Sequence, residues 1–283
     1  MPDLPARRSL LAVHAHPDDE SITMGGTLAR YAAAGLDITL VTATLGEEGE
    51  VIPAELQGLT AARADQLGGY RYTELHSACE ALGVTDRRQL GGLGTWRDSG
   101  MAGTPSAAHP RAFVRARSGG PDHDRAVAAL REVIDEMRPD VLLTYDADGG
   151  YGHPDHVASH EVAIAAANGR VPRVLAVVRS HQWATAALAD LKIPAGYLPA
   201  AAADLGYLAP EGDIAVAVDV RAQMPARDRA LAAHATQVEL IAGGFALSNR
   251  IAQPVGTTEY FKVLSGAQLP AGGVADDLFA GLP

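Results

Sequence analysis

Short apolar runs alternate with amphipathic stretches over roughly the first 180 residues of the chain. The apolar runs predict strands over residues 9–15, 37–44, 140–145 and 171–178. Between them, apolar positions spaced for one helical face predict helices over residues 23–34, 60–82, 122–137 and 154–168. Strands that alternate with helices predict an α/β fold of Rossmann-like type, in which helices flank a mostly parallel sheet.

Glycine marks several boundaries in this pattern. Gly35 occupies the position at which a helix over residues 23–34 should end, and Gly68-Gly69 predict a break within residues 60–82. Residues 91–121 are rich in Gly, Ser, Arg and Pro and show no periodicity. A stretch of that length without elements indicates a functional lid or a disordered segment.

The last hundred residues have a weaker pattern. Residues 181–212 are rich in Ala, Pro and Gly and allow no assignment, whereas residues 213–220 alternate as a half-buried strand does. A helix is predicted over residues 225–241 and a further strand over residues 260–264. We therefore expect a catalytic domain over residues 1–180, and a smaller C-terminal part over residues 181–283 that completes the sheet and the outer pocket wall of one compact unit.

Composition and charge exclude several classes of function. The chain of 283 residues has a net charge of -11, which argues against a nucleic-acid partner. Cys79 is the only cysteine, so an intramolecular disulfide is impossible, and a buried apolar role is expected for it. The first strand is not followed by the GxGxxG pattern of a dinucleotide site. A small-molecule substrate is therefore the expected partner, for a monomer or a small homo-oligomer.

The chain also lacks the usual signals for export or membrane insertion. Residues 1–5 contain no apolar core of a secretory signal, and no run approaches the roughly 18 apolar residues of a membrane span. We therefore expect a cytoplasmic protein that has no membrane partner.

Two clusters of histidine and aspartate follow predicted strands. Residues 14–20 read HAHPDDE directly after the first strand, and residues 151–156 read YGHPDH after the strand over residues 140–145. Either motif alone could be an ordinary turn or a helix N-terminus. Because the carboxyl ends of parallel strands meet at one sheet edge, the two together indicate a metal site there.

The residue types of the two clusters favour hydrolytic zinc chemistry. His16 and Asp19 can converge on one ion and His156 can supply a third ligand, which leaves a position open for water. Ferrous iron or another divalent ion would also fit nitrogen and oxygen ligands. Asp18, as a carboxylate that does not ligate the ion, is the expected general base.

The second cluster supplies candidates for the developing charge. His153 is expected to stabilise an oxyanion or to protonate a leaving amine, with Asp155 orienting its ring. The phenol of Tyr151 could also reach the oxyanion. His14 lies on the strand itself and is left out of the ligand set.

At these motifs the chain resembles the LmbE/PIG-L family of zinc-dependent N-acetylglucosamine deacetylases. The signatures HPDDE and HPDH stand unaltered at residues 16–20 and 153–156. Longer similar segments at residues 45–52, 65–71, 96–104 and 233–238 point within that family to enzymes of mycothiol biosynthesis. These enzymes deacetylate N-acetylglucosaminyl-inositol.

The resemblance implies a Rossmann-like fold, the zinc ligands and general base named above, and hydrolysis of a linear amide. It also implies substrate contacts from Glu50, Arg71, Asp98 and Met101. Three alternatives remain open at this stage: an amidase of mycothiol S-conjugates, a deacetylase of another N-acyl-glucosaminide, and a non-catalytic sugar-binding protein with a structural metal. The related mycothiol-conjugate amidases carry a lysine shortly after the first motif. Residues 21–24 here contain none, so the resemblance favours the deacetylase over the amidase.

Overall fold

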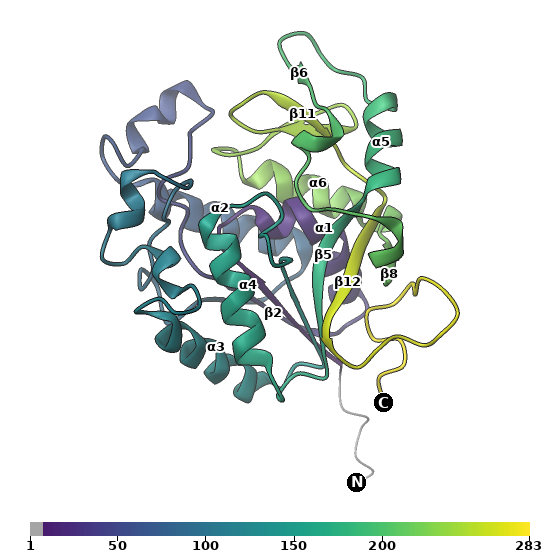
Figure 1. Ribbon diagram of the computed structural model, residues 1–283. Coiled ribbons are helices and arrows are strands. Elements are labelled where there is room, and N and C mark those ends of the chain that lie inside the picture. The colour runs from purple at the N-terminus through teal and green to yellow at the C-terminus, as the bar shows by residue number, and fades with distance from the viewer. Residues whose placement is uncertain (1–7) are drawn as a thin grey trace.

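A large twisted sheet forms the centre of the molecule (Figure 1). The structure is a computed structural model that describes residues 8–283, so the expectation drawn from residues 1–5 lies outside the described part. The strands run in the order β3-β2-β1-β4-β5-β12-β8, and the short strand β7 (Leu208–Ala209) pairs with β5. Their bounds are β1 Ser9–His14, β2 Asp37–Thr42, β3 Asp86–Gln89, β4 Val141–Thr144, β5 Arg173–Ser180, β8 Val216–Asp219 and β12 Thr258–Gly266.

The first five strands of this sheet are parallel, as the alternating pattern predicts. The order reverses between β1 and β4, which are neighbours in the sheet although β2 and β3 follow β1 in the chain. A doubly wound sheet opens a crevice at such a point, beyond the carboxyl ends of the strands. Both His/Asp motifs follow these two strands, so the topology brings them to the same place.

Helices cover both faces of the sheet because its central strands are apolar on both sides. Leu10 and Ala12 of β1 belong to one core, and Leu11 and Val13 belong to the other. The first core is covered by α1 (Asp19–Ala33), α2 (Leu67–Leu82) and α6 (Met224–Ala233). The second is covered by α3 (His123–Met137) and α4 (Pro154–Ala167).

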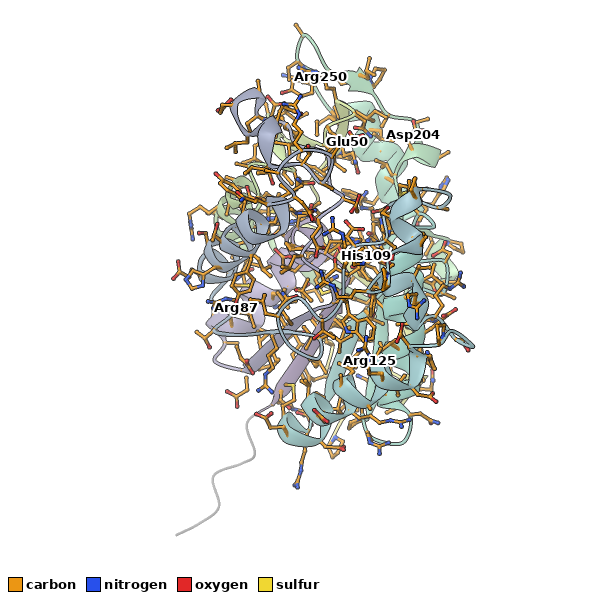
Figure 2. All side chains as sticks on the ribbon, turned by 90° about the vertical axis from the view of Figure 1, so that its left-hand side faces the viewer. Glu50, Arg87, His109, Arg125, Asp204 and Arg250 are labelled. Carbon is orange, nitrogen blue, oxygen red and sulfur yellow. The ribbon has the colours of Figure 1, made fainter. Side chains whose placement is uncertain are left out.

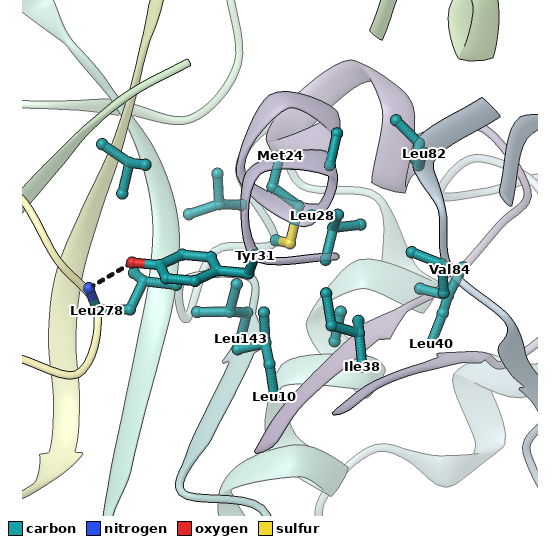
Figure 3. Close-up of a cluster of buried hydrophobic side chains, with 14 of the residues drawn as sticks. Leu10, Met24, Leu28, Tyr31, Ile38, Leu40, Leu82, Val84, Leu143 and Leu278 are labelled. Atoms are coloured by element: carbon teal, nitrogen blue, oxygen red, sulfur yellow. Dashed lines mark hydrogen bonds between the residues drawn. The ribbon is translucent and has the colours of Figure 1, made fainter. Parts of the chain in front are cut away.

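Helix α1 begins at Asp19, four residues before the predicted start, and contains a kink. Met24 leaves helical geometry, with φ −144° and ψ 20°, yet its side chain stays buried with Leu28 over the sheet (Figure 3). The kink frees the amides of Gly26 and Thr27, which donate to the buried carboxylate of Glu259 at 3.0 and 2.7 Å.

An arginine completes the support of this kink. Arg227 of α6 pairs with Glu259 at 3.1 Å and donates to the freed carbonyl of Ile22 at 2.7 Å. A buried ion pair therefore holds the element that carries the first motif.

The predicted break at Gly68-Gly69 is wrong, because both glycines lie inside α2. A Cβ on Gly68 would stand 2.7 Å from Cγ of Glu47, so the glycine lets the helix approach the acidic loop after β2. The helix starts only at Leu67, and residues 61–64 form a turn before it.

The predicted helix over residues 225–241 is also wrong beyond Ala233. Glu74 of α2 accepts hydrogen bonds from the amide and the hydroxyl of Thr236, at 2.8 and 2.6 Å, and these hold the chain in a turn. Three strands that follow the turn and one that precedes α6 form a four-stranded sheet in a small lobe. Its strands are β6 Leu198–Pro199, β9 Glu239–Ile241, β10 Gly244–Ala246 and β11 Ile251–Pro254, in the order β6-β11-β10-β9.

Two unassigned regions have definite structure. Residues 91–121 contain only short 3-10 turns at Pro105–Ala108 and Phe113–Ala116, but Trp96 and Phe113 are buried against one another. Helix α5 (His181–Asp190) follows β5 directly. Among residues 8–283, no helix has the length and apolar character needed to cross a membrane.

Candidate functional site

The two motifs meet at the carboxyl ends of β1 and β4. His16 Nδ1 lies 3.3 Å from His156 Nε2, and His156 Nε2 lies 3.4 Å from Oδ1 of Asp19. Oδ2 of Asp19 lies 3.6 Å from His16 Nδ1. The three side chains are buried, so three potential ligand groups face one another in a space with little access to water.

This spacing fits a divalent metal ion. Metal–ligand bonds of about 2.0–2.1 Å at tetrahedral angles place ligand atoms about 3.3–3.4 Å apart, close to the separations within this triangle. Two imidazole nitrogens that face each other with their lone pairs repel unless a proton or a cation lies between them. The anionic oxygen of Asp19 gives the same position a net attraction for a cation.

Tyr145, which sequence reasoning missed, holds two members of the triangle. Its hydroxyl donates to Asp19 Oδ2 at 2.6 Å and accepts the amide of Ala15 at 2.8 Å. Its ring stacks on His156 with a centroid distance of 4.2 Å. The Nδ1 of His156 lies 3.0 Å from the carbonyl of Gly149, which leaves Nε2 free for the ion. The only signal in the sequence is a tyrosine at the end of an apolar strand.

The outer nitrogen of His16 faces carboxylates. Its Nε2 lies 3.3 Å from Asp155 Oδ2 and 3.5 Å from Asp98 Oδ1. Burial alone would lower the pKa of His16, but these groups and Asp19 raise it well above its usual range. A carboxylate on the far nitrogen fixes the tautomer of a metal-binding histidine.

The position of Asp155 differs from the expected one. Its carboxylate contacts His16 and accepts the amide of Ser99 at 2.9 Å, rather than orienting the ring of His153. The backbone amide of Asp155 performs that task, because it donates to His153 Nδ1 at 3.2 Å. The residue lies at the start of α4, so its amide and its side chain point to different histidines.

His16 also belongs to two other groups whose ligand atoms lie within 4.8 Å of one another. One group adds His153 and His156, and the other adds Asp98 and Asp155. We favour the triangle with Asp19. In this triangle His16 Nδ1 faces the ion, and His16 Nε2 stays with the carboxylates of Asp98 and Asp155. The group of His16, Asp98 and Asp155 would instead leave His156 without a role.

Asp18 does not join the triangle. Its carboxylate lies 3.1 Å from a guanidinium nitrogen of Arg71, and its amide donates to Glu20 Oε2 at 3.0 Å. Burial raises the pKa of Asp18 to about 6, although Arg71 opposes the shift. Asp18 lines the same cavity as His16 and Asp19.

His153 and Tyr151 lie on the other side of the triangle. The ring centroid of His153 is 4.5 Å from that of His16, and burial together with His16 and His156 lowers the pKa of His153 to about 2. Tyr151 is 52% exposed and its ring meets that of His156 edge-on at 4.9 Å. Tyr207, which lies in a segment that sequence reasoning left unassigned, places its hydroxyl 3.4 Å from His156 Nδ1.

A cavity of about 1260 Å³ opens onto these groups. Its walls come from the acidic loop after β2, the irregular segment after β3, and the C-terminal lobe. Figure 2 shows Glu50 and Asp204 near the upper part of the molecule and His109 below them; all three line the cavity. The irregular segment thus forms a wall of the cavity.

The four substrate contacts implied by resemblance fall into two pairs. Glu50 and Met101 line the cavity and are exposed, Met101 to 48%. Arg71 and Asp98 also line it but are buried and engaged with the protein. Arg71 donates to Asp18, to the carbonyl of Pro17 and to that of Gly46, and Asp98 accepts the amide of Gly100.

The doubly wound sheet and the histidine–aspartate triangle at its switch point define an α/β enzyme with a site suited to a divalent cation. The model of the PIG-L family, described as GlcNAc-PI de-N-acetylase, matches residues 11–167. The chain belongs to this family.

Two curated relatives resemble the chain over nearly its whole length. A protein of Nakamurella multipartita is 65% identical, with 99% of this chain and 97% of the relative covered. One from Saccharomonospora viridis is 50% identical, with 96% and 100% covered. Both are named 1D-myo-inositol 2-acetamido-2-deoxy-alpha-D-glucopyranoside deacetylase.

Solved structures share the fold at low identity. A deacetylase of teicoplanin biosynthesis in complex with bog is 22% identical, with a TM-score of 0.52 and 89% and 97% of the two chains covered. GalB, the 4-carboxy-2-hydroxymuconate hydratase of Pseudomonas putida KT2440, is 16% identical, with a TM-score of 0.57 and 94% and 100% covered. Because one of these proteins is a hydratase, the fold alone does not set the reaction.

Proposed function

We propose that this protein hydrolyses the acetamide of 1D-myo-inositol 2-acetamido-2-deoxy-α-D-glucopyranoside, the deacetylation step of mycothiol biosynthesis. The products are acetate and the free amine. The observation that carries the proposal is the buried triangle of His16, Asp19 and His156, open on one side to a cavity that Asp18 also lines. Full-length relatives named for this reaction support the substrate.

We propose Zn²⁺ as the resident ion, held by His16 Nδ1, His156 Nε2 and the carboxylate of Asp19; Fe²⁺ suits the same ligands. Such an ion, when bound, polarises the amide carbonyl and acidifies water. We assign three protein ligands to it, because His153, which also lies near His16 and His156, has another role in this proposal. A structural zinc would normally be enclosed by four, so this count counts against a non-catalytic metal site.

Side chains of this protein transfer the protons and stabilise the negative charge that develops on the carbonyl oxygen. Asp18 takes a proton from the attacking water and returns it to the nitrogen as the carbon–nitrogen bond breaks. His153 accepts an amide hydrogen at Nδ1, so in the neutral ring Nε2 carries the hydrogen and can donate it to the developing oxyanion. Tyr151, at the cavity edge, is the second proposed donor to that oxyanion.

Two further assignments belong to this proposal. Glu50 and Met101 are the proposed contacts of the inositol part, since both are exposed in the cavity wall. We also propose a cytoplasmic location, which fractionation of cells would test. We propose a monomeric or small homo-oligomeric state, which light scattering of the purified protein would test.

The decisive experiment measures acetate release by metal-reconstituted protein. The panel contains the inositol glycoside, simple N-acetylglucosamine and a mycothiol S-conjugate. We expect the inositol glycoside to have the highest kcat/KM, chelation to abolish the activity, and Zn²⁺ to restore it. A higher kcat/KM for the conjugate would favour the amidase, and full activity in metal-free protein would remove the basis of the site assignment.

A further inference from the structure

Asp18, the proposed base, has a strained backbone. Its φ of 110° and ψ of −31° lie in a region that residues other than glycine rarely adopt. Such a conformation is unfavourable and persists only where the surroundings enforce it. In this conformation the Asp18 carboxylate lies 3.1 Å from the guanidinium of Arg71.

A buried carboxylate enforces this conformation. Glu20 Oε2 accepts the amide of Asp18 at 3.0 Å, while its Oε1 accepts the hydroxyl of Ser21 at 2.6 Å. Glu20 is fully buried. A buried carboxylate stays ionised and in place only when a cationic or hydrogen-bond-donating side chain pairs with it.

His234 is that partner, and it comes from the far end of the chain. Its Nε2 lies 2.7 Å from Glu20 Oε1, and both side chains are fully buried. Within the described residues, Nδ1 of His234 has no hydrogen-bond partner, so the polar contacts of this ring are directed at Glu20 alone. A ring with no solvent access cannot touch a substrate in the open cavity.

The backbone around His234 is also held in place by contacts with neighbouring elements. His234 is the C-cap residue directly after α6, and the turn that follows is anchored two residues later, where Thr236 bonds to Glu74. Helix α6 packs against both α1 and α2. The position of His234 is therefore fixed independently of the metal ligands.

We propose that His234 is a positioning residue for the deacetylation: through Glu20 it holds the strained backbone of Asp18, and so the carboxylate of the base, beside the metal site. This inference rests on the proposed role of Asp18. It separates Glu20, the last acidic residue of the HPDDE motif, from the chemical step, since Glu20 transmits a constraint and neither binds the ion nor contacts substrate.

The test uses two substitutions of His234 whose side-chain amides differ in length. In His234→Gln the side-chain amide nitrogen can occupy the place of Nε2 and donate to Glu20, whereas in His234→Asn it cannot reach. We expect His234→Asn to lower kcat about 10²-fold, the scale on which small misplacement of a catalytic group acts, with KM changed less than about threefold. His234→Gln should retain most of the rate, and both variants should bind metal as the wild type does.

Two further readouts exclude a general loss of structure. In an Asp18→Ala background, His234→Asn should leave the residual rate unchanged, because the base that it positions is gone. Amide exchange over residues 16–22 needs no substrate: protection of the Asp18 amide should be lost in His234→Asn and kept in His234→Gln.

Equal rate losses in both backgrounds, equal losses in the Gln and Asn variants, or unchanged protection of the Asp18 amide would overturn the inference. Failure of the wild type on every glucosaminide would instead overturn the proposed function. In that case the exchange measurement still decides whether His234 holds Asp18.

Discussion

Asp18 and Asp19 are adjacent in the chain but have different neighbours. Asp19 accepts hydrogen bonds from Tyr145 and from the amide of His16 and faces His156, whereas Asp18 meets Arg71. We expect Asp18→Asn to keep its metal and lose at least about 10²-fold in kcat. Asp19→Asn should lose metal as well. Metal analysis beside steady-state rates checks both, and the opposite pattern would show that the two aspartates have exchanged roles.

Tyr145 provides a second test at the residue scale. Tyr145→Phe keeps the ring that stacks on His156 but removes the hydroxyl that holds Asp19. Loss of such a supporting hydrogen bond typically weakens metal binding by about 10–100-fold, and we expect that effect in competition with a chelator. Tyr31→Phe, which removes another buried hydroxyl far from the site, is the control and should leave metal affinity unchanged.

At this scale the sequence indicates candidate residues within compact motifs, but not the residues that contact them from elsewhere in the fold. His16, Asp19 and His156 stand in two compact motifs after apolar runs, so local sequence points to them. Tyr145 and His234 act through contacts made across the fold, and a single tyrosine or histidine has no distinguishing local pattern. Asp155 lies within a motif, yet its partner could not be predicted because helix geometry decides where its carboxylate points.

At the scale of elements, the kink in α1 depends on two buried charges from other elements. Glu259 satisfies amides on one side of the kink, and Arg227 satisfies carbonyls on the other. Removing one partner of a buried ion pair leaves the other uncompensated. We expect Glu259→Leu to lower the free energy of unfolding by about 3–5 kcal/mol, measured by denaturant titration.

The double variant Glu259→Leu/Arg227→Met should lose less stability than the sum of its single variants, because no unpaired charge remains. Asp135→Asn breaks an exposed pair with Arg170 and should change the free energy of unfolding by less than about 1 kcal/mol. Additive losses for the buried pair would show that the two residues act independently.

Elements governed by their own periodicity could be predicted, and those governed by tertiary contacts could not. The helix after residue 122 and the strands around the switch point follow their hydrophobic patterns closely. The helix after residue 225 stops early because Thr236 bonds to Glu74, and α2 has a glycine at position 68 because Glu47 lies against it there. In each case a distant side chain overrides local preference.

At the scale of the whole molecule, the cavity wall assembled from three regions should set specificity. We expect Glu50→Gln and Met101→Ala to lower kcat/KM for the inositol glycoside about tenfold each. Both should barely affect simple N-acetylglucosamine, because it lacks the inositol that these exposed residues are proposed to contact. Arg71→Ala should lower kcat/KM for both substrates alike, since it loosens Asp18 and Pro17. Selective loss in Arg71→Ala would make that residue a direct contact.

The parallel core of the sheet could be predicted from alternating strands and helices, but its completion could not. Residues 213–220 and 260–264 are recognisable as strands, yet nothing local indicates that the later one pairs antiparallel with β5 and separates it from the earlier one. Pairing order depends on which apolar faces remain open once the helices are placed.

During synthesis on the ribosome, β12 is made long after β5, the strand with which it pairs. β5 is apolar and buried along most of its length, and its neighbour on one side begins only at Thr258, near the end of the chain. At about 5–20 residues per second, most of this strand edge stays unpaired for several seconds after β5 has left the ribosome. An open apolar edge is a template for pairing with another chain, so nascent or truncated forms that end before residue 258 should aggregate or require a chaperone.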